Sequence, residues 1–366
     1  MRILVLNGGS SSFKIALYEL SGEAAQPLWK EHMELPGDRL ADTLEPVLRN
    51  AGTPDIAGHR IVHGGKAYRA STRLTPEVRA AIAAQRDIAP AHNRLELEAI
   101  DTVSRVFGSS LPQVAVFDTA FHATIEPAAY TYPGPHDWVD REGIRRYGFH
   151  GISYQYASRR TAEILNKTPG RALLCHLGNG ASLCAVREGK SIDTTMGFTP
   201  LEGLMMGTRC GSIDPGIIVY LLRHRGYTAE QLDRILNRES GLFGVSGVSA
   251  DMRAVFESAA SGDGRAQLAL DVYMHRLVRE AGAMIAVLGG LDVLVFTGGV
   301  GENSAPVREA LCRELAFLGV ALDAAKNVSS EEDRNIAAAS SNIPLLVIHA
   351  QEEWEIAREC WRISSG

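Results

Sequence analysis

Short apolar runs alternate along the chain with longer stretches in which apolar residues recur every three to four positions. The short runs predict strands at Arg2–Leu6, Ile15–Tyr18, Ile56–His63, Pro112–Phe117, Leu291–Phe296 and Leu345–Ile348. The longer stretches predict helices at Leu40–Asn50, Thr75–Gln85, Leu95–Phe107, Ile217–His224, Ala229–Arg238, Gly264–Leu288 and Glu352–Trp361. Strands that alternate with helices in this way indicate an α/β protein.

One part of this pattern occurs twice. Arg2–Leu6 and Ile15–Tyr18 flank the turn Asn7–Lys14, which predicts a hairpin. The segment Arg171–Arg187 repeats the order of an apolar strand, a turn of Gly, Asn and Ser, and a second apolar strand. The two segments are too short to prove duplication alone, but with the repeated strand-helix order they predict two related halves. A chain of 366 residues is also long enough for two domains.

Composition excludes several classes of protein. The net charge of −6 argues against a basic surface for nucleic acid or anionic lipid. The longest apolar run, 281–300, is broken by Gly289, Gly290 and Asp292, so a membrane span is not expected, and the N-terminus lacks a signal-peptide pattern. The five cysteines form no CxxC pair, which favours reduced thiols. A cytoplasmic enzyme is therefore expected.

Three glycine-rich turns follow predicted strands, at Asn7–Lys14, His176–Ser182 and Gly298–Asn303. Glycine lets backbone N–H groups approach phosphate oxygens without a Cβ in the way. No turn matches GxxxxGK[ST], and none has GxGxxG opening a helix. A single such turn is more often an ordinary hairpin, but three on a repeated α/β frame favour binding of nucleotide phosphates.

Two arginines stand between apolar residues and glycines, Arg60 in GHRIVHGG and Arg209 in MGTRCGSIDPG. Most arginines form surface ion pairs, yet this repeated setting fits a planar group that binds a carboxylate or phosphate. Asp118 follows a buried strand, where a carboxylate can meet Mg²⁺, although for that residue taken alone turn capping is the better explanation. Glu352 and Glu353 begin the last helix, where capping and metal binding are about equally good explanations.

Eight motifs occur in order: NGGSSSFK, GHRIVHGG, APAHN, FDTAFH, YGFHG, HLGNG, FTPLEGLMMGTRCGSIDPG and TGGVGENS. Together they resemble the acetate kinase family over essentially the whole chain. The resemblance implies a duplicated actin-like (ribonuclease H-like) α/β fold, with two domains and a cleft between them. It also implies a homodimer that uses ATP with Mg²⁺ or Mn²⁺. The expected domains are 1–122 plus 354–366, and 123–353.

The resemblance further implies roles for residues at matching positions. The expected catalytic residues are Asn7, Arg60, Asp118, His150 and Arg209. The expected acyl-substrate contacts are Arg60, Val62, Ala91, Phe149 and Pro200, with His92 in support. The expected ATP contacts are Ser10, Ser12, Lys14, His176, Gly178, Asn179, Gly180, Asp251, Arg253, Gly299, Val300 and Asn303. The expected metal ligands are Asn7 and Glu352, with Glu353 as the alternative to Glu352.

A carboxylate acceptor suits these residues. It is already ionised at pH 7 and needs no general base, so direct in-line transfer without a phospho-enzyme is expected. Ala91 stands where the family usually has leucine, and a wider pocket predicts better use of propionate or butyrate, at about 0.8 kcal/mol per buried CH₂. The segment 15–59 is shorter than in the family, which predicts loss of a peripheral strand or hairpin. The alternatives are a propionate or butyrate kinase, a non-catalytic actin-like ATP-binding protein, and a pyrophosphate-dependent kinase.

Overall fold

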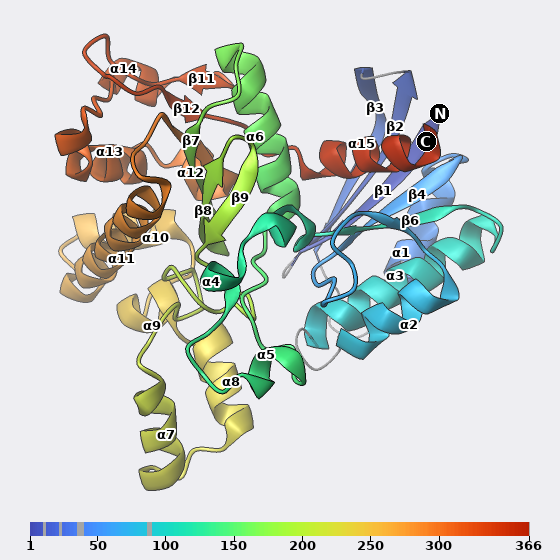
Figure 1. Ribbon diagram of the computed structural model, residues 1–366, viewed down its shortest axis with the longest axis horizontal. Helices are drawn as coiled ribbons and strands as arrows, with labels where there is room; N and C mark the ends of the chain where they lie inside the picture. Colours follow the sequence, from blue (N-terminus) through green and yellow to red (C-terminus); the bar gives the residue numbers. More distant parts are fainter. Residues whose placement is uncertain (10–11, 22–23, 35–39, 86–89, 366) are drawn as a thin grey trace.

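Two six-stranded sheets form the framework of the protein in a computed structural model that describes residues 1–9, 12–21, 24–34, 40–85 and 90–365 (Figure 1). The first sheet contains β1 (Arg2–Gly8), β2 (Ser12–Ser21), β3 (Ala24–Glu34), β4 (Ile56–Ile61), β5 (Thr72–Arg73) and β6 (Gln113–Phe117). The second contains β7 (Arg171–Leu177), β8 (Ala181–Arg187), β9 (Lys190–Thr194), β10 (Val293–Thr297), β11 (Arg334–Asn335) and β12 (Leu345–Val347).

The two sheets have the same topology. The first runs β3-β2-β1-β4-β6-β5, and the second, read from its other end, runs β9-β8-β7-β10-β12-β11. In the first sheet, β3, β2 and β1 pair antiparallel, β4 and β6 run parallel to β1, and the short strand β5 pairs antiparallel with β6. In the second sheet, β9, β8 and β7 pair antiparallel, β10 and β12 run parallel to β7, and the short strand β11 pairs antiparallel with β12. The predicted duplicated α/β fold is therefore confirmed. The predicted domain limits, 1–122 plus 354–366 and 123–353, remain a prediction.

Helices cover both faces of each sheet (Figure 1). The longer helices are α1 (Leu40–Asn50), α2 (Pro76–Ala84), α3 (Pro90–Phe107), α6 (Gly151–Leu165), α7 (Pro215–His224), α8 (Ala229–Arg238), α10 (Met252–Ala260), α11 (Gly264–Leu288), α13 (Ala305–Glu314) and α15 (Glu352–Ser365). The shorter ones are α4 (Pro127–Tyr130), α5 (Asp137–Asp140), α9 (Gly241–Ser246), α12 (Gly298–Asn303) and α14 (Ala324–Asn327), with 3-10 turns at Ala120–Thr124 and Ala316–Leu318. Within the described ranges, no helix is both long enough and apolar enough to cross a bilayer.

Successive side chains of a strand point to opposite faces of the sheet, so each sheet can bury apolar residues on both faces. In β1, Leu4 belongs to the cluster that includes apolar residues of α1 and α3, whereas Ile3 belongs to the cluster with α15. The second sheet repeats this arrangement, because Leu174 packs with α6 and its neighbour Leu173 packs with α11. Consequently α15, at the end of the chain, completes the core that β1 begins.

Several predicted elements differ from the observed ones. The third glycine-rich turn was predicted wrongly, because Gly298–Asn303 forms the short helix α12. The Gly298 N–H donates to Glu302 Oε1 at 2.9 Å, so a side chain within this helix occupies its first donor. Helix α3 begins at Pro90 rather than at residue 95. The segment 15–59 contains β3, an 11-residue strand paired with β2, and the loss of a peripheral strand or hairpin relative to the family remains a prediction.

Candidate active site

Residues from both halves of the chain line a cavity of about 170 Å³. Its wall consists of Gly9, Arg60, Val62, Asp118, Phe149, His150, His176, Gly178, Asn179, Gly180, Pro200, Arg209 and Glu352. Many of these residues lie at or just beyond the carboxyl ends of β1, β4, β6 and β7. This is the edge at which α/β proteins generally bind ligands.

A larger cavity of about 460 Å³ adjoins the first. The two share Gly9, Arg60, His176, Asn179 and Glu352. The larger one continues along Asn7, Ser12, Lys14, Lys30, Gly298, Gly299, Glu302, His349, Ala350, Gln351 and Glu353. The glycines and lysines of this lining can contact a polyanion, and its three glutamates can contact a cation.

Arg60 is a mostly buried cation, and each of its three guanidinium nitrogens donates one hydrogen bond. Its Nε and Nη2 donate to Asp118 Oδ2 at 3.1 and 2.5 Å, and its Nη1 donates to the Gly8 carbonyl at 2.7 Å. Burial alone lowers the pKa of Arg60, but the carboxylates of Asp118 and Glu352 outweigh it and raise that pKa above its usual value. Arg60 therefore stays charged, and Asp118 fixes its orientation.

Arg209 differs from Arg60 because no carboxylate in the described part of the chain forms an ion pair with it. Its Nη1 donates to the Pro200 carbonyl at 3.2 Å. Burial, followed by repulsion from Arg60, lowers the pKa of Arg209. Arg209 thus faces the cavity without a paired carboxylate, an arrangement that favours a bound anion.

Two histidines stack beside these arginines. The rings of His150 and His176 have centroids 4.2 Å apart. The Nδ1 atom of His150 lies 2.9 Å from Ser182 Oγ, and that of His176 lies 2.8 Å from Ser153 Oγ. Burial is the main cause that lowers the pKa of both histidines, and for His150 the neighbouring His176, Arg60 and Arg209 lower it further. Both rings are therefore neutral at pH 7 and act as hydrogen-bonding groups.

The first residues of α15 meet the end of β1. Asn7 Nδ2 donates to Glu352 Oε2 at 2.9 Å and to Glu353 Oε1 at 2.7 Å. Lys14 Nζ lies 3.6 Å from Glu353 Oε1. Glu352 lines both cavities, whereas Glu353 lines only the larger of the two. Burial raises the pKa of Glu352, but Arg60 and His176 outweigh this effect and hold it below its usual value.

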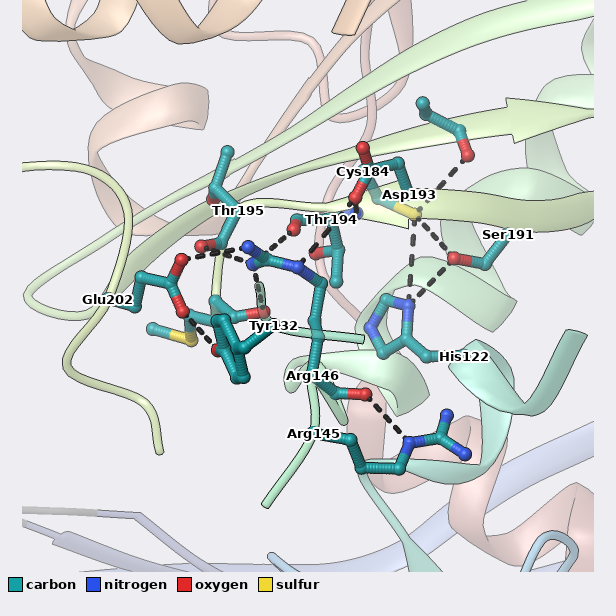
Figure 2. Close-up of polar contacts among 12 residues, drawn as sticks. His122, Tyr132, Arg145, Arg146, Cys184, Ser191, Asp193, Thr194, Thr195 and Glu202 are labelled. Atoms are coloured by element: carbon teal, nitrogen blue, oxygen red, sulfur yellow. Dashed lines mark hydrogen bonds and ion pairs between the residues drawn. The ribbon is translucent and has the colours of Figure 1, made fainter. Parts of the chain in front are cut away.

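A polar network beside the smaller cavity fixes the loop 196–203 (Figure 2). Arg146 Nη1 donates to three successive carbonyls, those of residues 194–196, at 2.9–3.1 Å, and its Nη2 donates to Glu202 at 2.8 Å. The Tyr132 hydroxyl bonds to Glu202 and accepts the Phe198 N–H at 2.9 Å. One guanidinium and one carboxylate thereby join the two ends of the loop that presents Pro200 to Arg209.

His122 supports the segment that carries His150 (Figure 2). Its Nε2 lies 2.9 Å from the Phe149 carbonyl, and its Nδ1 lies 2.8 Å from Ser191 Oγ. Burial lowers the pKa of His122 to about 4, so the ring is neutral. A Cβ at Gly148 would lie 2.6 Å from this ring, which explains the glycine at that position.

Glu96 was not singled out from the sequence. Its carboxylate accepts the Val62 N–H at 2.7 Å and is buried beneath the strand that carries Arg60. Burial raises the pKa of Glu96 to about 7, although the Val62 N–H and Arg60 oppose the rise. A signal was present, because Glu96 shares a helical face with the buried Ile100 and Val103, four and seven residues later.

Replacing Glu96 with glutamine is expected to remove one pH-dependent contribution to stability. The folded protein holds the Glu96 proton up to about pH 7, whereas the unfolded chain releases it near pH 4.5. This contribution is therefore complete below pH 4.5 and is lost as the pH rises to about 7, an effect of about 3 kcal/mol. Urea unfolding from pH 5.5 to 8 should show the variant gaining stability relative to the unmodified protein. A constant difference across that range would contradict the assignment.

Most of the site residues predicted from the sequence line one of the two cavities, but some do not. Asp251, Arg253, Val300 and Asn303 line neither cavity. Asp251 caps α10 and pairs with Arg253 at 2.6 Å, and Asn303 bonds to the Gly299 carbonyl at 2.9 Å. Ser10 lies outside the described residues, as do the side chains of Ala91 and His92.

Known proteins share the sequence pattern and the fold of this chain. The model of the Acetokinase family matches residues 38–358. The acetate kinase of Gloeobacter violaceus is 51% identical, with 99% of each chain covered. The structure of Porphyromonas gingivalis acetate kinase is similar at 36% identity with a TM-score of 0.89, and 99% of each chain is covered. A propionate kinase from Francisella tularensis gives 38% identity, a TM-score of 0.88 and 98% coverage of each chain. The chain belongs to the acetokinase family.

Proposed function

We propose that this protein is an acetate kinase, which transfers the γ-phosphoryl group of ATP reversibly to the carboxylate of acetate. The observation that carries the proposal is the pair Arg60 and Arg209, which line one small cavity from opposite halves of the chain. That cavity adjoins the larger glycine-lined space, so a small anion and a polyphosphate would meet at the arginines. Family membership and the named relatives support the same activity.

Phosphoryl transfer between two anions depends on positioning and charge neutralisation. Arg209 would bind the acceptor carboxylate and the transferring phosphoryl group, and Arg60, fixed by Asp118, would bind them from the other side. His150 would donate a hydrogen bond to the phosphoryl oxygen, and Val62, Phe149 and Pro200 would enclose the acyl chain. The acceptor needs no base. An acid-labile phosphocarboxyl on Asp118 or Glu352 during turnover would contradict direct transfer.

The residues between the two cavities fit a divalent cation. Asn7 Oδ1 and Asp118 Oδ1 are buried and have no hydrogen-bond partner in the described part of the chain, and Glu352 lies beside Asn7. No group of three or more His, Cys, Asp or Glu side chains there could hold a metal by itself. Mg²⁺ commonly takes only one or two protein carboxylates and completes its shell with water and phosphate oxygens. Asn7 and Glu352 would hold Mg²⁺, or Mn²⁺ in its place, and the bound cation would offset the negative charge of the phosphate groups.

The larger cavity would hold ATP. Ser12 and Lys14, with Ser10, would contact the phosphates from the first hairpin, and His176, Gly178, Asn179 and Gly180 from the second. Gly299 lines the same space near α12. The adenosine would extend toward Asp251, Arg253, Val300 and Asn303, which lie beyond the cavity walls.

One hydroxamate assay tests the proposal. The protein is incubated with acetate, propionate or butyrate, with ATP, GTP or pyrophosphate as donor, and with Mg²⁺ or a chelator. We expect acyl phosphate from acetate with ATP, and a loss of product when the metal is removed. No product from any acid would overturn the proposal, and activity with pyrophosphate would identify a different donor.

Replacing Ala91 with leucine is expected to narrow the range of acids. The sequence predicts that residue 91 borders the acyl pocket, where a leucine would take the space of an extra CH₂ of substrate. On that prediction, kcat/KM for propionate relative to acetate should fall by at least about fourfold per CH₂. The similarity to a propionate kinase makes this comparison informative. If the unmodified protein already shows a steep fall beyond acetate, Ala91 does not widen the pocket.

We further propose that the protein forms a homodimer through α7. No residue of α7 is buried, and Ile217, Val219, Tyr220 and Leu222 are 42–46% exposed. The helix extends away from both sheets (Figure 1). Changing Tyr220 and Leu222 to glutamate should give a monomer by light scattering, whereas Arg79→Ala on the first half should not. If the protein with glutamate at positions 220 and 222 is still a dimer, α7 is not the interface. A cytoplasmic location remains a prediction.

A further inference from the structure

A chain of buried hydroxyl groups lies behind His150. The Tyr154 hydroxyl is 2.6 Å from Ser182 Oγ, and Ser182 Oγ is 2.9 Å from His150 Nδ1. Tyr154, on α6, and Ser182, on β8, are both fully buried. Phosphoryl transfer does not require either hydroxyl to contact a substrate. Ser182 links Tyr154 to Nδ1 of His150, the ring nitrogen that faces away from Gly180.

The direction of the protons along this chain follows from the partners. Burial raises the pKa of Tyr154 well above its usual value, so the phenol keeps its proton. Among the described residues, Ser182 Oγ is the side-chain atom within hydrogen-bond distance of the Tyr154 hydroxyl, so the phenol proton is donated to Ser182 Oγ. Since a serine hydroxyl has one proton, that proton is directed to His150 Nδ1. Nδ1 therefore acts as an acceptor.

The opposite nitrogen of His150 faces the site. A Cβ built at Gly180 would lie 3.5 Å from His150 Nε2 and 3.4 Å from Arg209 Nη1. Both atoms therefore approach the same short stretch of the second hairpin, at the wall of the smaller cavity. Because the ring is neutral, it carries one N–H, and accepting at Nδ1 leaves that proton on Nε2.

We propose that Tyr154 and Ser182 are positioning residues that hold His150 in its Nε2–H tautomer and thereby aim an N–H donor at the transferring phosphoryl group. The proposal rests on the proposed function for the identity of the anion. The other tautomer would direct a lone pair at a phosphate oxygen and repel it. Tautomer control has large effects elsewhere, since a histidine fixed in the wrong tautomer costs a serine protease about 10⁴ in kcat.

The test combines a spectrum of the resting protein with kinetics. Nitrogen-15 NMR of the histidine rings distinguishes protonated from unprotonated nitrogens, and His150→Gln identifies the signals of His150. The unmodified protein should show Nε2 protonated and Nδ1 unprotonated. Tyr154→Phe and Ser182→Ala should each give a mixture of tautomers. They should lower kcat about tenfold to a hundredfold, less than the full loss of an oxyanion donor, with KM for ATP and acetate within about twofold.

Tyr156→Phe is the matched control, because Tyr156 lies on the same helix and no hydrogen bond joins it to His150 among the described residues. It should leave the His150 signals and kcat unchanged. A His150 that carries its proton on Nδ1 would overturn the proposal, as would a Tyr154→Phe protein with an unchanged spectrum and unchanged kcat. Ser182→Ala combined with His150→Ala should lose no more activity than His150→Ala alone. The NMR result stands even if acetate is not the substrate, so the two proposals fail separately.

Discussion

Replacing Arg209 with alanine is expected to lower kcat/KM for the carboxylate by about 10²–10³, while the free energy of unfolding stays the same or rises slightly. Arg209 faces the cavity without an acidic partner, and burial and Arg60 already disfavour its charge. Its removal therefore takes away anion binding and relieves repulsion within the protein. Such a combination is typical of a group placed for a ligand rather than for folding.

The measurement pairs steady-state kinetics for acetate and ATP with urea unfolding. Arg79→Ala is the matched control, because Arg79 pairs with Asp101 on the surface, at 2.7 Å. The control should change neither quantity appreciably, since exposed ion pairs contribute about 0–1 kcal/mol. An Arg209→Ala protein with full activity, or one destabilised by several kcal/mol, would show that Arg209 has a structural role instead.

Replacing Arg60 with methionine is expected to affect both activity and stability. Asp118 is fully buried, and losing Arg60 would leave its carboxylate without its ion-pair partner. Removing one member of a buried pair costs about 3–5 kcal/mol of stability, and kcat/KM should also fall by about 10³. Unfolding curves at pH 7 and kinetics on the folded fraction separate the two effects.

The double substitution Arg60→Met with Asp118→Asn provides the control for this prediction. It removes the uncompensated charge, so much of the lost stability should return while activity stays low. Stability that does not recover would place the cost in packing around Arg60 rather than in the orphaned carboxylate. Activity that does recover would exclude Arg60 from the site.

Arg60 and Arg209 show which properties of the site the neighbouring sequence could predict and which it could not. The apolar neighbours and glycines around Arg60 and Arg209 predicted that both would bind anions, and both line one cavity. Nothing in either segment indicated that Asp118 would occupy Arg60 and leave Arg209 without an acidic partner. That difference arises because β4 and β6 are adjacent parallel strands, with Arg60 opposite Val116 and Asp118 just beyond the paired residues.

Other residues of the site could not be identified from local sequence patterns either, because their contacts are with residues far apart in the chain. Helix α6 was not predicted, although it carries Tyr154 and begins directly after His150. Ser182, the hydrogen-bond partner of Tyr154, was identified from the sequence only as part of a glycine-rich turn. Glu96 was read as an ordinary residue of an amphipathic helix, and its burial depends on the strand that packs over it. The position of α12 also depends on a residue far along the chain. The carboxylate of Glu302, within α12, accepts hydrogen bonds from the N–H of Gly298 at the start of the helix and from the N–H of Ala350.

The sequence by itself determined the alternation of strands and helices, the repeated hairpins, the bounds of α1, α8 and α11, and the family, because each depends on periodicity or on contiguous motifs. Only the tertiary structure decided that the two sheets share one topology, which carboxylate pairs with which cation, and which hydroxyls reach His150. Hydrogen bonds and ion pairs act over about 3–4 Å between residues far apart in the chain. Those distances are set by packing of the two sheets and their helices, which no local pattern contains.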